Sequence, residues 1–164
     1  MTLEAITTFI RFSDSDNTSI EHFKFQNSTT TGVIDYVRPG ETNAEPYDFL
    51  PFIYSGATKS VSGDNIESSL TFAANPISIG YAQEARENGY LVEVNTVLMT
   101  PTTFAPSRTL TTEYWIASGL NYNVEAVQLS LSSSIDAVSS FVPNKVLLSK
   151  NVGALPVSSR ISNV

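Results

Sequence analysis

The stretch ESSLTFAANPISIGYAQEARENGYLVEVNTVLM, residues 67–99, decides the fold. Near its start, apolar Leu70 and Phe72 alternate with polar neighbours, and residues 91–99 alternate in the same way. Alternation with a period of two is typical of β-strands that bury one face. The stretch therefore predicts two strands with one other element between them.

That intervening element is predicted to be a helix over about residues 76–88. Asn75 can cap its N-terminus, Pro76 suits its first turn, and Gly89 ends it. Apolar residues at helical spacing form its predicted buried stripe: Ile77, Tyr81, Ala82 and Ala85. Such a helix can cover one open side of a small barrel or sandwich.

Outside this stretch, further alternation predicts strands over residues 5–12, 20–25, 32–37, 47–54, 110–116 and 127–131. Pro51 cannot donate to a β-ladder, so the strand that contains it is predicted to be an edge strand or a bulged one. The fold class is therefore predicted as mostly β: a small antiparallel β-barrel or sandwich with one helix packed on it. Residues 1–138 are predicted to form the β-rich core domain. Residues 139–164 form a C-terminal extended segment, part of the same domain or an interface arm.

Composition narrows the classes of function. The chain has 164 residues, of which 15% are charged, and a formal net charge of −7. Cations this sparse argue against sequence-specific nucleic-acid binding, which needs clustered Lys and Arg. No run reaches the roughly 20 apolar residues of a membrane helix, so no stable membrane insertion is expected. Cysteine is absent, which excludes thiolate chemistry, and the N-terminus does not resemble a signal peptide, so synthesis in the cytoplasm is expected.

Two motifs were weighed for chemistry. His22 is the only histidine and would have to be the base of any Ser–His pair, yet no Gly-x-Ser-x-Gly motif accompanies it. We favour a strand histidine at a surface or interface. Asp14-Ser15-Asp16-Asn17 resembles the start of a calcium loop but lacks its glycine and closing glutamate, so a hairpin turn is favoured. No metal site and no cofactor are predicted.

Paired carboxylates could in principle hydrolyse glycosides. Glu93 and Glu113 lie on separate predicted strands and alternate with apolar neighbours, so we favour solvated strand faces for both. The chain is not predicted to be an enzyme.

Carbohydrate binding is the alternative function: a β-sandwich module that recognises host-surface sugars. Trp115 alternates out of phase with Tyr114 and Ile116, so it could face outward. Tyr114, Trp115 and Tyr122 would then form a stacking platform. Core or interface packing of the single tryptophan is the more usual outcome.

Two groups of short motifs carry a family resemblance. They are YDFLPFIYSGAT (47–58) with SGDNIESSL (62–70), and VQLSL (127–131) with IDAV (135–138), FVP (141–143) and NVGALP (151–156). Together they resemble the minor tail proteins of tailed bacteriophages, in particular the lambda-type minor tail protein L. The cysteine-rich iron–sulfur domain of that family is not implied, because this chain has no cysteine.

The resemblance implies a structural virion component of a phage tail tip or baseplate. Such a component forms a threefold or sixfold ring that connects the tail tube to the hub or spike. Its implied partners are copies of itself and other tail tube, hub or spike proteins, and its location is the tail of the virion. The residues expected at its interfaces are Phe49, Phe52, Tyr54, Val152, Leu155 and Pro156. For the three aromatic residues, ordinary core packing is at least as well favoured.

Overall fold

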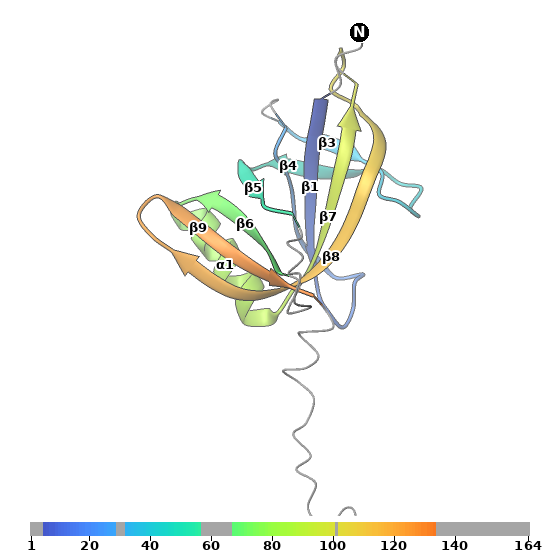
Figure 1. The fold of residues 1–164 in the computed structure, drawn as a ribbon. Coiled ribbons are helices and arrows are strands. Elements are labelled where there is room, and N and C mark those ends of the chain that lie inside the picture. The colour runs from blue at the N-terminus through green and yellow to red at the C-terminus, as the bar shows by residue number, and fades with distance from the viewer. Residues whose placement is uncertain (1–4, 29–31, 57–66, 101, 134–164) are drawn as a thin grey trace, which may run out of the picture.

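The computed structural model describes residues 5–28, 32–56, 67–100 and 102–133 (Figure 1). These residues form nine strands and one helix: β1 (Ala5–Ser13), β2 (Glu21–Gln26), β3 (Ile34–Tyr36), β4 (Glu45–Phe49), β5 (Phe52–Tyr54), β6 (Glu67–Ala73), α1 (Pro76–Asn88), β7 (Leu91–Met99), β8 (Pro106–Tyr122) and β9 (Ala126–Ser132). The predicted mostly-β class with one helix is confirmed. Residues 139–164 lie outside the described residues, so the predicted division of the chain stays a prediction.

All nine strands belong to one sheet with the order β3-β4-β2-β1-β7-β8-β9-β6-β5. Every neighbouring pair is antiparallel except β2 and β4, which run parallel. The hydrogen-bonded order has two ends, so the sheet is not closed into a barrel. Strand β8 bends the sheet: its first part pairs with β7, and residues from Ile116 onward pair with β9. The sheet therefore has two parts that share β8 (Figure 1).

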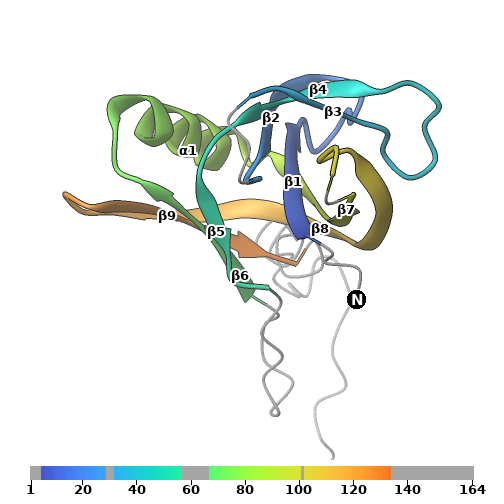
Figure 2. The same cartoon turned by 90° about the horizontal axis from the view of Figure 1, so that it is seen from above.

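The two parts of the sheet are also joined by the chain between β4 and β5. Strand β4 lies beside β2 in one part, and β5 lies beside β6 at the edge of the other. Only Leu50 and Pro51 separate the two strands, and the segment spans the gap in Figure 2. Pro51 has no N–H to give to a ladder, which suits a point where one strand ends and the next begins. The predicted single strand over residues 47–54 is therefore wrong: it is two strands, of which β5 lies at an edge of the sheet and β4 lies between β3 and β2.

Asn27 links the two parts with its side chain. Its Oδ1 accepts a hydrogen bond from the Thr8 N–H at 2.8 Å, and its Nδ2 donates to the Phe52 carbonyl at 3.2 Å. Thr8 belongs to β1 and Phe52 to β5, so one amide bridges strands that are not neighbours in the sheet. The side chain supplies hydrogen bonds where the backbone ladder is interrupted.

We expect Asn27→Ala to lower the free energy of unfolding by about 1–2 kcal/mol, because the Thr8 N–H and the Phe52 carbonyl each lose a partner. Asn27→Asp keeps the acceptor for Thr8 but loses the donor to Phe52, so its loss should be smaller. Urea denaturation followed by circular dichroism measures both variants. An alanine variant as stable as the wild type would show that the bridge contributes nothing.

Helix α1 confirms the predicted boundaries. Asn75 Oδ1 accepts from the Ser78 N–H at 2.8 Å, and Ser78 Oγ accepts from the Asn75 N–H at 3.2 Å, so each side chain caps the other residue's backbone. Gly89 ends the helix with a left-handed φ of 60°, which glycine adopts without a steric penalty. The predicted buried stripe is wrong at Ile77, which is 64% exposed. It is confirmed at Ala82 and Ala85, which are buried together with Ser78, a residue outside the predicted stripe.

Strands β1 and β7 are covered on both faces. On one face Ile10, Val92 and Val94 join the main core, which includes the buried residues of α1, β6 and β9. On the other face Phe9 and Val97 pack under the β3–β4 hairpin in a second, smaller core. Within it the Phe9 ring stacks on Tyr36, with centroids 4.5 Å apart. Polar side chains on this second face of β1 and β7 are therefore buried too.

Candidate functional site

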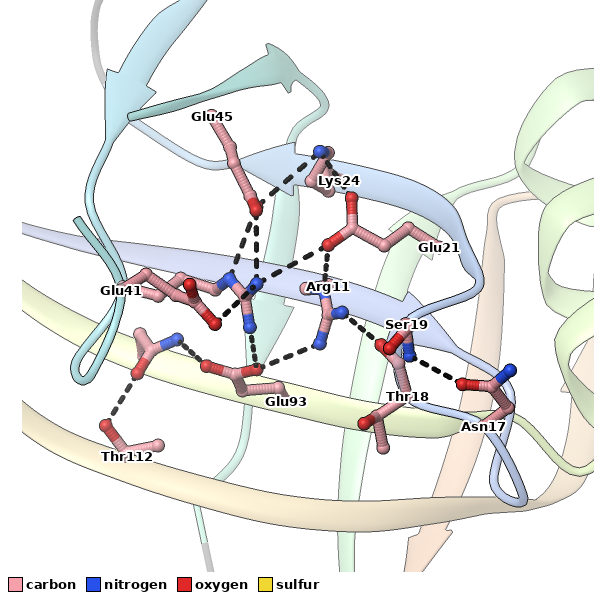
Figure 3. Close-up of polar contacts among 12 residues, drawn as sticks. Arg11, Asn17, Thr18, Ser19, Glu21, Lys24, Glu41, Glu45, Glu93 and Thr112 are labelled. Atoms are coloured by element: carbon pink, nitrogen blue, oxygen red, sulfur yellow. Dashed lines mark hydrogen bonds and ion pairs between the residues drawn. The ribbon is translucent and has the colours of Figure 1, made fainter. Parts of the chain in front are cut away.

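A cluster of charged residues lies beside the smaller core (Figure 3). We name it the ion cluster; its members are Arg11, Glu21, Lys24, Arg38, Glu41, Glu45 and Glu93. Arg11 of β1 and Glu93 of β7 are register partners in the antiparallel pair, so their side chains leave the same face. Arg38 and Glu45 come from the β3–β4 segment, which covers that face.

Glu93 is the centre of the ion cluster. Its Oε2 lies 3.3 Å from Arg11 Nη1 and 3.4 Å from Arg38 Nη1, and its Oε1 accepts from Asn95 Nδ2 at 2.8 Å. The side chain of Glu93 is 4% exposed and that of Arg11 is 5% exposed. The expectation of a solvated strand face is therefore wrong for Glu93. It fails because the hairpin that covers this face is distant in sequence.

The outer members of the cluster balance the two arginines. Glu21 accepts from Arg11 Nε and from Lys24 Nζ, both at 2.7 Å. Glu45 accepts from Arg38 Nε at 3.2 Å and from Arg38 Nη2 at 3.1 Å, the forked geometry that suits guanidinium and carboxylate groups. With three cations and four carboxylates, the cluster nearly neutralises itself.

Electrostatics within the cluster favours the charged forms. Burial alone would raise the pKa of Glu21, but hydrogen bonds from Lys24 and Arg11 outweigh it and lower that pKa. Burial would likewise lower the pKa of Arg38, but the hydrogen bonds and charge of Glu45 and the charge of Glu93 raise it. These shifts favour the charged forms of Glu21 and Arg38. The ion cluster holds the β3–β4 segment against the sheet. It also holds the Thr18 carbonyl there, because that carbonyl accepts a hydrogen bond from Arg11 Nη2.

The two candidate glycosidase carboxylates do not meet. Glu93 is the register partner of Tyr114, and the next residue, Val94, is the partner of Glu113. Successive residues of a strand point to opposite faces, so Glu93 and Glu113 lie on opposite sides of the sheet. Glu113 accepts a hydrogen bond from the Tyr54 hydroxyl on its own side.

His22 and the Asp14–Asn17 segment form a local unit. His22 lies in β2, its Nε2 is 2.8 Å from Asp14 Oδ1, and its ring stacks on Tyr90 with centroids 4.1 Å apart. The Asp14 N–H donates to the Ile20 carbonyl at 3.0 Å, and Asn17 Oδ1 accepts from the Ser19 N–H. The predicted hairpin turn is confirmed. In the described ranges, no group of three or more His, Asp or Glu is placed to hold a metal ion.

The three aromatic residues of the carbohydrate hypothesis do not form one platform. Trp115 is 4% exposed and belongs to the main core, so the favoured interpretation of core packing is confirmed and the outward-facing alternative is wrong. Tyr114 and Tyr122 are exposed, but they lie eight residues apart on β8, up to about 26 Å along an extended strand. Tyr114 and Trp115 alternate, and it is the tryptophan that faces the core.

The predicted interface residues have different positions. Phe52 is buried in the main core against Phe72, so for this residue core packing is found and the interface prediction is wrong. Phe49 is half-buried, and Tyr54, also half-buried, binds Glu113. Burial and the nearby Glu113 raise the pKa of Tyr54. Val152, Leu155 and Pro156 lie outside the described residues.

Two grooves on the described surface are lined largely by apolar residues. One is lined by Phe49, Pro51 and Ile53 together with the ends of β6 and β9. The other is lined by Pro76, Ile79, Tyr122 and Val124 near the start of α1. They meet where the Ala74 N–H donates to the Glu125 carbonyl at 2.9 Å.

We name Phe49, Pro51, Ile53, Tyr122 and Val124 the apolar rim. Ile53 is 72% exposed, Tyr122 66% and Val124 96%. Sequence reasoning missed Ile53 and Val124, although Val124 follows Asn121-Tyr122-Asn123 in a stretch rich in turn residues. This run of turn residues was the feature of the sequence that indicated an exposed hairpin tip.

No helix of the described segments is long and apolar enough to cross a membrane. The sequence matches no family model, and a search of the curated proteins finds no significant match.

Proposed function

We propose that this chain is a structural subunit of a phage tail tip or baseplate, which works by assembling with copies of itself and with other tail proteins. The observation that carries the proposal is the apolar rim. Five apolar residues from two separate segments, 49–53 and 122–124, line the two grooves there. Exposed apolar side chains around grooves of this kind mark sites of protein interaction.

The chemistry of the rim suits a protein partner. None of its five side chains carries a charge, and charge is depleted at the centres of protein interfaces. Tyr122 adds an aromatic ring with a polar end, a residue type enriched at interfaces. Val124 at the β8–β9 turn projects furthest, and transferring such a side chain from water into an interface contributes about 1.5–3 kcal/mol.

Interactions outside the apolar rim support a structural role, because they keep the strands in a fixed arrangement. The ion cluster joins segments distant in sequence within one part of the sheet, and the Asn27 bridge joins that part to β5 in the other. The charged groups of the cluster satisfy one another and leave little for a substrate. The resemblance to phage minor tail proteins supports the class of assembly, a ring between tail tube and hub or spike. The net charge of −7 suits a channel that must not retain DNA.

The test uses the full chain and the tail proteins encoded beside its gene. We expect the purified proteins to form a complex of defined mass by light scattering. Replacing Ile53 and Val124 together by lysine should weaken that complex about tenfold or more, because two apolar contacts are replaced by buried charges. Val33→Lys is the matched control, since Val33 is 61% exposed and lies outside the rim.

An unchanged complex with the double variant would remove the rim from the interface. No complex with any neighbouring tail protein, or a gene located away from all such proteins, would overturn the proposed function.

A further inference from the structure

The first half of β8 has one open edge. Residues from Pro106 to Ile116 pair with β7 on one side. Strand β9 pairs with β8 on the other side only from Ile116 to Tyr122. Among the described residues, no strand pairs with the second side of residues 106–115 (Figure 1). Natural proteins seldom leave a long strand edge uncovered, because its N–H and C=O groups invite another strand.

We propose that this edge pairs with the same edge of a second copy, antiparallel and about a twofold axis. The inference rests on the proposed function, because it names one surface through which copies assemble. Twofold contacts of this kind can join two threefold rings face to face.

Charge selects the register of the pairing. The edge carries one cation, Arg108, and one anion, Glu113. If Arg108 lies opposite Glu113 of the second copy, the twofold axis places the reverse pair at the other end, so two opposite-charge contacts form. Arg108 is exposed and makes no ion pair with any residue in the described ranges. Opposite-charge pairs directly across an antiparallel ladder are stabilising, whereas like charges there are destabilising.

The faces of the strand agree with this register only because β8 contains a bulge. Arg108 and Glu113 are an odd number of residues apart, which in a regular strand would put them on opposite faces. The register against β7 shifts between Thr96 and Val97: Thr96 pairs with Thr111, and Val97 pairs with Thr109. Leu110 is the extra residue. Beyond it, Arg108 pairs with Leu98, which is on the same face as Val94, the partner of Glu113.

The other pairs in this register are compatible. Thr109 lies opposite Thr112, and both are on the face of the smaller core, where Thr109 contacts the Tyr36 hydroxyl and Thr112 donates to Asn95. The bulged Leu110, which is 45% exposed, lies opposite Thr111 next to the axis. Pairing would bring the two copies of Leu110 close together and cover part of their exposed surface.

Sedimentation equilibrium of the full chain tests the inference. We expect the wild type to associate reversibly into pairs. Arg108→Glu and Glu113→Arg should each weaken pairing about tenfold, because each creates two like-charge contacts. An equimolar mixture of the two variants should pair again, since every contact between unlike copies is then between opposite charges. Tyr54→Phe is the control for Glu113, because it removes the hydrogen bond within the chain and should leave pairing unchanged.

A wild type that stays monomeric over the accessible concentrations would overturn the inference. So would variants that pair like the wild type, or a mixture that shows no recovery. These outcomes are separate from the test of the proposed function, which depends on the apolar rim and on binding to other tail proteins.

Discussion

Replacing Glu93 by alanine is expected to lower the free energy of unfolding by about 3–5 kcal/mol, the range found when one partner of a buried ion pair is removed. The Glu93 carboxylate forms ion pairs with both Arg11 and Arg38, and its side chain is nearly inaccessible to water. Without it, the Arg11 guanidinium remains buried with Glu21 as its remaining carboxylate partner in the described ranges. Urea denaturation followed by circular dichroism gives the stability.

Glu41→Ala is the matched control within the same cluster. Glu41 is 53% exposed and contacts Arg38 at 3.7 Å, so its removal should change stability by less than about 1 kcal/mol. Equal losses for the two substitutions would contradict the central position of Glu93. Glu93→Gln should fall between them, because it keeps the shape of the side chain and one acceptor oxygen but removes the charge.

The second large effect concerns the only tryptophan. Trp115→Ala is expected to destabilise the protein by about 3–5 kcal/mol, because it leaves a cavity in the main core. Tyr114→Ala is the control: it is the adjacent residue, and its side chain is 57% exposed on the opposite face. Its effect on stability should be within about 1 kcal/mol. Thermal unfolding by circular dichroism compares the two variants.

The same pair of variants separates packing from sugar recognition. If Trp115 were a binding platform, Trp115→Ala would keep the stability of the wild type and lose only glycan binding. A stable alanine variant would therefore contradict the burial described here. The intrinsic fluorescence of the wild type adds a direct check, since a buried indole should resist quenching by acrylamide.

Some features of the fold follow from short stretches of sequence. The helix was predicted with its observed ends because Asn75, Ser78 and Gly89 act within one or two turns of the backbone. Pro51 was correctly expected to disturb strand pairing within residues 47–54, because its missing N–H is a property of that residue alone. Alternation also predicted most of the strands, because the two faces of a strand differ wherever one of them is buried.

Alternation alone did not show how both faces of β7 are used. Val92 and Val94 mark one buried face, so Glu93 was expected to face water. In the folded chain the β3–β4 segment covers that second face and brings Arg38 to Glu93. For Trp115, alternation left two interpretations open, and the folded chain places it in the main core, the interpretation that was favoured. The apolar rim depends on two segments distant in sequence, β4–β5 and the turn between β8 and β9.

By itself the sequence determined most elements of this protein: the helix, its caps and most of the strands. These depend on backbone hydrogen bonds and steric limits that act over a few neighbouring residues. Only the tertiary structure decided which polar residues are buried and which apolar residues are exposed. Glu93 is 82 residues from Arg11 and 55 from Arg38. Burial is set by whichever distant segment packs against a face, and no local pattern records that segment's identity.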